Sequence, residues 1–494
     1  MSCSKRQIGF SRKIGNLAGH WCRAFGKSWG FALPMAMLAV FWAFPAFAAT
    51  LSVPSAAYST ISQAVKSASP GDTIHVRPGI YKEQVKITKS ITLVTTPGVT
   101  DANGNSRAII DGGGVGRPME VTSPGVVLKG LAFRASGDDL DAPDACIFAS
   151  ESARGLRIED NLISDCAFGI WINSTPDTQI LYNQVVGRDR PVFSDRGNGI
   201  HLWRVRNALV KGNRINTVRD GIYISVSTAS RVISNQMWQV RFGIHYMYND
   251  DNEIEDNLTC NSLVGLAMMF SKRLLIRGNT AINNKDHGIF FRSILDTRIE
   301  GNRATGNGKG FVFNEVLFNQ ITQNHVADNR VGIEVTGGSE ENKIWRNNFL
   351  GNDIQVKYTW RHVQPWDHNK IGNYWGDYLG WDANRDGAGD QPYYSANRAD
   401  WLVQQYPQVK LLAASPLVSM MQMLEARFPI LRPAGVVDHF PALKPFPKAT
   451  GASVKPGPEC GILPKDTQAQ AQPSTADQAI ERDPLQNPSI EKRT

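Results

Sequence analysis

The stretch that decides the fold is residues 231–270, RVISNQMWQVRFGIHYMYNDDNEIEDNLTCNSLVGLAMMF. It contains one pattern twice, an Asn followed eight residues later by a Gly and an apolar residue. The Gly–apolar pair recurs on both sides, at Gly169, Gly199, Gly221, Gly243, Gly265, Gly288, Gly310 and Gly332. The Asn keeps the same spacing, at Asn161, Asn183, Asn213, Asn235, Asn257, Asn279, Asn302 and Asn324. This period of about 22 residues predicts a solenoid, in which each repeat is one coil stacked on the last.

The residues between these markers indicate which kind of solenoid is formed. Apolar and polar residues alternate, and β-branched and aromatic residues are plentiful, which favours short strands over helices. Leucine-rich repeats have a similar length, but their fixed Leu lattice is absent. We therefore predict an all-β fold, a right-handed parallel β-helix. In this interpretation each Gly supplies a positive φ where the coil turns, while stacked Asn side chains bond along the turns and tolerate left-handed geometry.

Residues 1–48 have the features of a cleavable secretory signal. They carry six basic residues and no acidic one, and an apolar run ends in Ala46-Phe47-Ala48, a small-residue cleavage site. The alternative is an uncleaved membrane anchor, but the run is short and is broken by Pro34 and Pro45. We expect export to the periplasm. Without residues 1–48 the chain holds 47 Lys and Arg against 45 Asp and Glu, so we expect no nucleic-acid partner.

The N-terminal part of the mature chain predicts a cap for the solenoid. Thr60 and Gln63 have the spacing of a capping box, and Ile61, Ala64, Val65 and Ala68 give one apolar helical face. A short helix there would cover the open end of the first coil, as solenoid ends require. Further along, the 30-residue spacing between two marker glycines predicts an insertion at residues 187–197, on one face of the solenoid.

The C-terminal part departs from the repeat. Residues 416–428 predict a helix with Ser415 as N-cap. Beyond about residue 445 the composition turns to Pro, Gln, Ala and Ser, which is typical of disorder. We expect five parts. They are a signal (1–48), an N-terminal cap with the first coils (49–135), regular repeats (136–372), a C-terminal loop and helix extension (373–445) and a disordered tail (446–494).

Four cysteines remain after removal of the signal, and their spacing matches no zinc pattern. Cys146 and Cys166 are placed so that they can lie on neighbouring coils and form a disulfide in an oxidising compartment. We expect Cys260 to be a small core or turn residue.

Stacking places side chains in rows, because neighbouring strand residues point to opposite faces and coils lie about 4.8 Å apart. The residue after each marker Gly is expected in the core. The next residue then forms an outward row, His201, Tyr223, His245, Ala267 and Phe290, and two residues further the second outward row is Trp203, Ser225, Met247, Met269 and Arg292.

The two rows bring His245, Met247 and Met269 together on one outward patch spread over two coils. One imidazole and two thioethers suit a soft cation, Cu(I) above all, and we expect a shallow site. His201 and His287 are secondary candidates. The competing interpretation is a docking patch, since Met and aromatic residues on an outer face are typical of protein interfaces.

A second candidate metal site follows the last coil. Asp382, Asn384 and Asp386 alternate before a Gly, as at the start of a calcium loop, and Asp390 follows. The twelfth position is Tyr393 rather than Glu, so the loop is not an EF-hand. Structural Ca²⁺ is one interpretation, and a Gly- and Asp-rich turn that closes the solenoid is the other.

Several motifs in order resemble the NosD family, periplasmic accessory proteins of nitrous-oxide reductase. The resemblance spans about residues 60–443 and rests on segments 243–252, 265–273, 373–378, 381–393 and 427–438. It implies a β-helix of the carbohydrate-binding and sugar-hydrolase type and a role in copper supply. The implied partners are an ABC-type ATPase with its membrane subunit, a copper chaperone lipoprotein and apo nitrous-oxide reductase. The chain itself has no GxxxxGK[ST] loop, so ATP hydrolysis is expected in a partner.

The copper ligands do not follow from the resemblance, and they are a hypothesis from residue placement. Two other functions compete with copper transfer by a protein that is not an enzyme. A lyase or epimerase acting on polysaccharides would need a base with a neutralising group, for which Arg292 and Asp250–Asp251 are candidates. A docking scaffold would bind no metal at all.

Overall fold

The computed structural model describes residues 48–359, 362–395, 415–416, 420, 424, 435–447 and 457–460. The predicted signal before residue 48 lies outside them, as do most of the predicted helix 416–428 and most of the predicted tail. Within the described residues no helix is long and apolar enough to cross a membrane.

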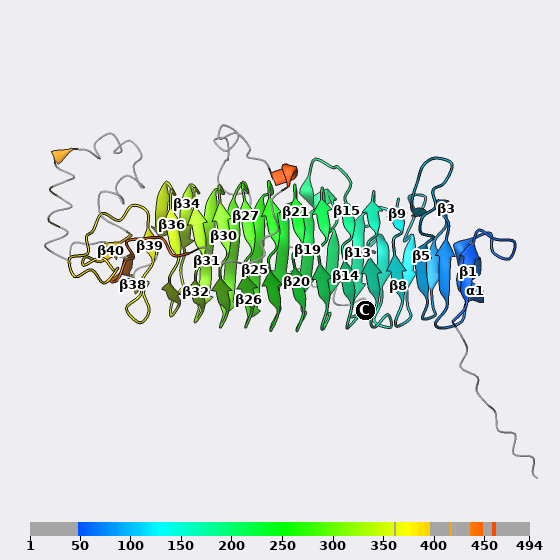
Figure 1. Cartoon of the computed structure of the whole chain (residues 1–494), viewed down its shortest axis with the longest axis horizontal. Coiled ribbons are helices and arrows are strands. Elements are labelled where there is room, and N and C mark those ends of the chain that lie inside the picture. The colour runs from blue at the N-terminus through cyan, green and yellow to red at the C-terminus, as the bar shows by residue number, and fades with distance from the viewer. Residues whose placement is uncertain are drawn as a thin grey trace, which may run out of the picture. The chain divides into compact units, whose positions relative to one another are not determined.

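The described chain winds through three long parallel sheets, so that each coil gives one strand to each sheet (Figure 1). Sheet A has 13 strands, β1 (Thr50–Val53), β2 (Thr73–Val76), β5 (Thr92–Thr95), β8 (Val127–Lys129), β11 (Arg157–Glu159), β14 (Gln179–Leu181), β17 (Leu209–Lys211), β20 (Arg231–Ile233), β23 (Glu253–Glu255), β26 (Leu275–Arg277), β29 (Arg298–Glu300), β32 (Gln320–Thr322) and β35 (Lys343–Trp345). Sheet B also has 13, β3 (Gly79–Lys82), β6 (Ala108–Asp111), β9 (Ala132–Arg134), β12 (Leu162–Ser164), β15 (Gln184–Val186), β18 (Arg214–Asn216), β21 (Gln236–Trp238), β24 (Leu258–Cys260), β27 (Thr280–Ile282), β30 (Arg303–Thr305), β33 (His325–Ala327), β36 (Asn348–Leu350) and β39 (Tyr374–Trp375).

Sheet C carries the longest strands. Its 12 members are β4 (Val85–Ile87), β7 (Met119–Val121), β10 (Ala145–Ala149), β13 (Phe168–Asn173), β16 (Ile200–Trp203), β19 (Asp220–Ser225), β22 (Phe242–Met247), β25 (Val264–Lys272), β28 (His287–Leu295), β31 (Lys309–Leu317), β34 (Val331–Val335) and β37 (Ile354–Tyr358). A small sheet of β38 (Gln364–Pro365), β41 (Val436–Asp438) and β40 (Tyr393–Tyr394) follows the last coil. The predicted right-handed parallel β-helix is therefore confirmed.

The predicted N-terminal cap is present as α1 (Ile61–Ser67), beside β1 in Figure 1. Both halves of the capping box form, because the Thr60 side chain accepts from the Gln63 amide and the Gln63 side chain accepts from the Thr60 amide. Ile61, Ala64 and Val65 are buried, as the apolar face predicted.

The interior of the coils is one continuous apolar core, and the predicted inward residues lie in it. Ile222, Ile244, Leu266 and Ile289 are register partners from coil to coil and are fully buried. Met268 also points inward, as the alternation predicts.

The marker glycines have a different role from the one predicted. None of those from Gly169 to Gly332 has a positive φ. A Cβ on Gly265 would lie 2.4 Å from the carbonyl oxygen of Gly288 and 2.6 Å from Oγ1 of Thr259. The same kind of close contact with the next marker glycine recurs at Gly221, Gly243 and Gly288. These positions need Gly because backbone packs directly on backbone, not because the chain turns there.

The marker asparagines form a ladder through the solenoid. From Asn161 to Asn347, the backbone N–H and the side-chain NH₂ of each Asn both donate to Oδ1 of the next one, at 2.9–3.1 Å. Bonding along the turns is thus confirmed. The left-handed backbone, however, falls on the residue before each Asn, such as Asp160, Ser234 and Gly278.

Asp438 terminates this ladder. Asn373 ends the row of asparagines, and its backbone N–H donates to Oδ2 of Asp438 at 2.7 Å. The Trp375 indole N–H donates to the same oxygen at 2.8 Å, and the Phe440 amide donates to Oδ1 at 3.0 Å. The carboxylate thus supplies the acceptor that a further coil would otherwise provide.

A pH dependence of stability follows from Asp438. Burial, only partly offset by these hydrogen bonds, raises the pKa of Asp438 from 3.8 to about 6. The folded state therefore binds the proton more tightly, and this contribution is fully present below about pH 4 and lost as the pH rises through 6. We expect unfolding free energy to fall by roughly 3 kcal/mol over that interval from this group. Chemical denaturation of the parent and of Asp438→Asn between pH 4 and 7 checks it, because the variant is expected to lose this component of the slope.

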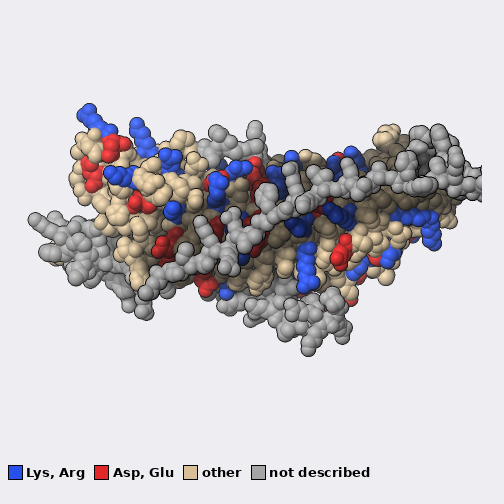
Figure 2. All heavy atoms as spheres, turned by 90° about the horizontal axis from the view of Figure 1, so that it is seen from below, with Lys and Arg blue, Asp and Glu red and all other residues tan. Residues whose placement is uncertain are grey.

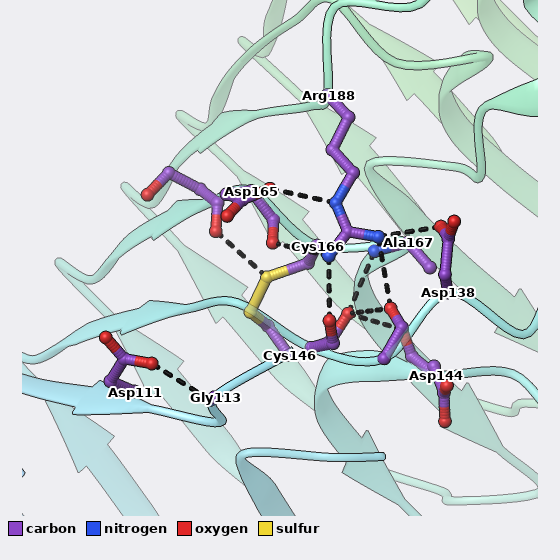
Figure 3. The surroundings of a disulfide bond; sticks show 12 residues. Asp111, Gly113, Asp138, Asp144, Cys146, Asp165, Cys166, Ala167 and Arg188 are labelled. Carbon is purple, nitrogen blue, oxygen red and sulfur yellow. Dashed lines mark hydrogen bonds and ion pairs between the residues drawn. A yellow bond between two sulfur atoms is a disulfide. The ribbon is translucent and has the colours of Figure 1, made fainter. Parts of the chain in front are cut away.

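The predicted insertion lies between β15 and β16 and contains the 3₁₀ turn η1 (Phe193–Asp195). Arg188 ties it to the coils before it (Figure 3). Its five N–H groups donate to the side chains of Asp165 and Asp138 and to the carbonyls of Ser136, Gly137 and Asp165, at 2.7–3.1 Å. Cys146 and Cys166 form a disulfide next to this contact, as was predicted to be possible.

Cys260 is not the small core or turn residue expected. It lies in β24, with its side chain on the outer side of sheet B, and forms a disulfide with Cys460 in the 3₁₀ turn η4 (Pro458–Cys460). Further along the solenoid, Asn348 in β36 exchanges two hydrogen bonds with the backbone of Phe446. Residues 446–447 and 457–460, which fall in the predicted tail, are therefore held against sheet B.

This disulfide predicts a difference in thiol reactivity. In Cys460→Ser, the η4 turn that covers the Cys260 side chain is no longer attached to it by a disulfide. The Cys260 thiol is therefore expected to react readily with a maleimide under native conditions. The matched control is Cys166→Ser, whose remaining Cys146 thiol is fully buried in the core and should stay protected until the chain unfolds. Equal labelling rates for the two thiols would contradict this view of Cys260.

Candidate metal centre

The three proposed copper donors lie on the outer face of sheet C, on two neighbouring strands. His245 and Met247 lie on β22, and Met247 is the register partner of Met269 on β25. Both predicted outward rows are reproduced, since Tyr223 pairs with His245 and Ser225 with Met247. The alternation of a strand puts all three donors on the face opposite the core.

The donors belong to an apolar cluster separate from the core. Met247 and Met269 pack with Tyr223, Phe242 and others of that cluster, and the complete set is Tyr223, Phe242, Met247, Val264, Ala267, Met269, Phe290 and Val312. His245, Met247 and Met269 are only 2%, 6% and 2% exposed. The expectation of a shallow site is therefore wrong, because the thioethers and the imidazole are buried although they point away from the core.

The imidazole of His245 has a defined orientation. It lies edge-on to the rings of Tyr223 and Phe242, both at 4.9 Å between centroids. Its Nδ1 is 3.1 Å from Oδ2 of Asp220, which is fully buried. The hydroxyl of Tyr223 also approaches Sδ of Met247, at 3.8 Å.

Asp220 is ionised in this environment. Burial opposes its charge, but Arg241 donates to both carboxylate oxygens at 2.8 and 2.7 Å and His245 adds a further hydrogen bond. The net result is a pKa of Asp220 well below its usual range. Sequence reasoning missed this residue, although one signal was present: Asp220 precedes a marker Gly at a position where the next two coils have Phe242 and Val264.

The secondary candidates lie on neighbouring coils of sheet C, at the edges of this group. His201, two coils before His245, is stacked on Trp171 at 3.6 Å, and its Nδ1 is 3.0 Å from the side-chain amide of Asn198. Burial, followed by the charge of Arg219, holds the pKa of His201 well below its usual value, so it is neutral. His287 is fully buried in a third outward row, as register partner of Val264.

The donor set fits Cu(I) by its chemistry. Thioether sulfur and neutral imidazole are soft or borderline ligands, which select Cu(I) over hard cations. No group of three or more His, Cys, Asp or Glu side chains in the described part of the chain is arranged to hold a metal ion.

The loop of the predicted calcium site uses its side chains to shape its own backbone. Asp382 accepts from the amides of Asp386 and Gly387, and Asn384 accepts from that of Asp386. Asp390 accepts from the amide of Ala383 at 2.6 Å. These are the bonds of a Gly- and Asp-rich turn, and calcium binding stays a prediction.

The acidic residues considered for a polysaccharide-active site are engaged with basic ones. Asp251 binds Arg273 through two hydrogen bonds, and Asp250 is paired with Lys272. A further carboxylate outside that candidate pair, Glu334 on β34, likewise lies between Lys309 and Lys357, at 2.7 and 3.0 Å. Figure 2 likewise shows positive and negative side chains interspersed over the visible face.

The fold and the site define a class of protein, a parallel β-helix with a buried thioether–imidazole cluster on one outer sheet face. The chain matches the family model described as "Periplasmic copper-binding protein (NosD)" over residues 182–380, and one described as a protein of unknown function over residues 50–266. It is 39% identical to a "Probable ABC transporter binding protein NosD" of Pseudomonas aeruginosa, over 68% of this chain and 82% of that protein. A protein of the same description from Stutzerimonas stutzeri is 35% identical, over 74% and 85%. The chain belongs to the NosD family.

Solved structures with a similar fold are distant. The A-module of the mannuronan C-5 epimerase AlgE6 from Azotobacter vinelandii has a TM-score of 0.44 at 13% identity, over 60% of this chain and 90% of that one. The Dettilon tailspike protein has a TM-score of 0.42 at 14% identity, over 60% and 64%.

Proposed function

We propose that this protein is a periplasmic accessory protein that binds Cu(I) through His245, Met247 and Met269 and passes it on for assembly of the copper centres of nitrous-oxide reductase. The observation that carries the proposal is the register of β22 and β25, which places two thioethers side by side and an oriented imidazole on the same face. The description of the family as periplasmic and copper-binding supports the cargo and the compartment.

Transfer fits the donor set better than catalysis. Three ligands leave copper coordinatively open to a ligand from an incoming protein, so that one ligand can replace another without release of free copper. The aromatic rings around His245 exclude water from the donors. Because the donors are buried, exchange requires a local movement on the outer face of sheet C.

The partners we propose are an ABC-type ATPase with its membrane subunit, a copper chaperone lipoprotein and the apo reductase. The relatives' description as ABC transporter binding proteins supports the first of these. In this account the ATPase supplies the energy, and this chain acts as the copper-carrying component.

Anaerobic titration of the mature chain with Cu(I), against a colorimetric competitor, tests the proposal. We expect retention of about one copper ion per chain, since the register gives one such donor group. No retention would leave a docking scaffold without metal. Turnover of an oligosaccharide by the same preparation would favour instead the lyase or epimerase interpretation.

A further inference from the structure

Two histidines of the same outward row have different partners at Nδ1. His245 faces the carboxylate of Asp220, while His201 faces the side-chain amide of Asn198. Asn198 and Asp220 are 22 residues apart, which is one repeat. The same position on two neighbouring coils is therefore occupied by an amide in one and a carboxylate in the other. The hydrogen-bond partner of one ring nitrogen decides which nitrogen of a neutral imidazole carries the proton.

Asp220 forces the proton of His245 onto Nδ1. Both oxygens of Asp220 accept from Arg241, at 2.8 and 2.7 Å, so this carboxylate accepts hydrogen bonds and donates none. At 3.1 Å, Nδ1 of His245 must therefore be the donor. In the neutral ring the lone pair is then on Nε2, and a lone pair is what an imidazole nitrogen needs to bind a metal ion.

Asn198 imposes the reverse arrangement on His201. Arg219 donates from Nε to Oδ1 of Asn198 at 3.2 Å, which fixes that oxygen as the acceptor of the amide. The amide nitrogen then donates to Nδ1 of His201 at 3.0 Å. His201 consequently holds its proton on Nε2, and this nitrogen has no lone pair for a metal.

We propose that Asp220 is the positioning residue of the copper site, which keeps Nε2 of His245 deprotonated for Cu(I), and that Asn198 sets the opposite neutral form, protonated on Nε2, in His201. The role of Asp220 in copper binding rests on the proposed function, whereas the protonation states of His245 and His201 do not. The arrangement is that of a ligand histidine whose other nitrogen donates to a carboxylate, which orients the ring and raises its basicity.

The experiment is imidazole ¹⁵N NMR of the full mature chain without metal, followed by Cu(I) titration. Signals are assigned with His245→Gln and His201→Gln. In the parent we expect the Nδ1–H form for His245 and the Nε2–H form for His201. Asp220→Asn should switch His245 to the Nε2–H form and weaken Cu(I) binding by roughly 10–100-fold. Asp220→Glu, which keeps a carboxylate, should retain both the Nδ1–H form of His245 and the copper affinity. Asn198→Asp should switch His201 to the Nδ1–H form without changing copper affinity.

Each outcome decides a separate point. The Nε2–H form of His245 in the parent overturns the proposal outright, even if Asp220→Asn does not fold. A folded Asp220→Asn that keeps parental copper affinity overturns the positioning role. The expected protonation states in a parent that retains no copper would contradict the proposed function alone, because the hydrogen-bond arrangement would stand without its cargo.

Discussion

Replacing Met247 and Met269 together with Leu is expected to abolish Cu(I) retention while the solenoid stays folded. Both thioethers are lost, and the imidazole of His245 alone is left to bind the ion. We expect affinity to fall by more than about 100-fold, because changes behind the ligands already cost 10–100-fold. The fold should persist, since Leu and Met are close in volume and such swaps usually cost less than about 1.5 kcal/mol.

The matched control is Met268→Leu, on the same strand. Met268 lies between the two coils' donors in sequence but points into the core, so its substitution removes a thioether without removing a proposed ligand. Competitor titration of parent, control and double variant measures the effect. Parental copper affinity in the double variant would refute the ligand assignment.

Gly265→Ala is expected to disrupt the stack of coils. Its Cβ would lie 2.4 Å from the carbonyl oxygen of Gly288 and 2.9 Å from Cβ of Ala281, and neither atom can move without moving a coil. Overpacking of this kind costs about 1–3 kcal/mol and more where backbone must shift. We expect a loss of at least about 3 kcal/mol at this site, measured by denaturant unfolding.

Gly155→Ala separates steric overlap from the general effect of replacing glycine. Gly155 has a φ of 71°, and a Cβ there meets nothing within 4 Å. Its cost is the left-handed backbone alone, about 1–2 kcal/mol. If Gly265→Ala were no more destabilising than Gly155→Ala, the close approach of marker glycines would not be what requires Gly.

The repeat period made most of the fold and the candidate donors predictable. Residues that lie one repeat apart in the sequence become register partners on neighbouring coils. A constant spacing is therefore enough to place His245, Met247 and Met269 on one face, without any knowledge of the turns. The insertion before β16 was equally visible, because it interrupts that spacing.

Contacts between residues that are not related by the repeat period could not be predicted from the sequence. Asp438 meets Asn373 across 65 residues, and Cys460 meets Cys260 across 200, in a segment with no repeat. The role of the marker glycines was misjudged for a related reason: close contact between coils leaves the same signature in sequence as a turn. Burial of the copper donors was missed too, since alternation gives only the direction of a side chain.

The measurement that tests the central claim most directly is X-ray absorption at the copper edge of the Cu(I)-loaded mature protein. The account predicts a first shell with two sulfur ligands and one imidazole nitrogen, and loss of the sulfur scattering in Met247→Leu/Met269→Leu. A shell of nitrogen and oxygen only, or sulfur scattering that survives the double substitution, would contradict it.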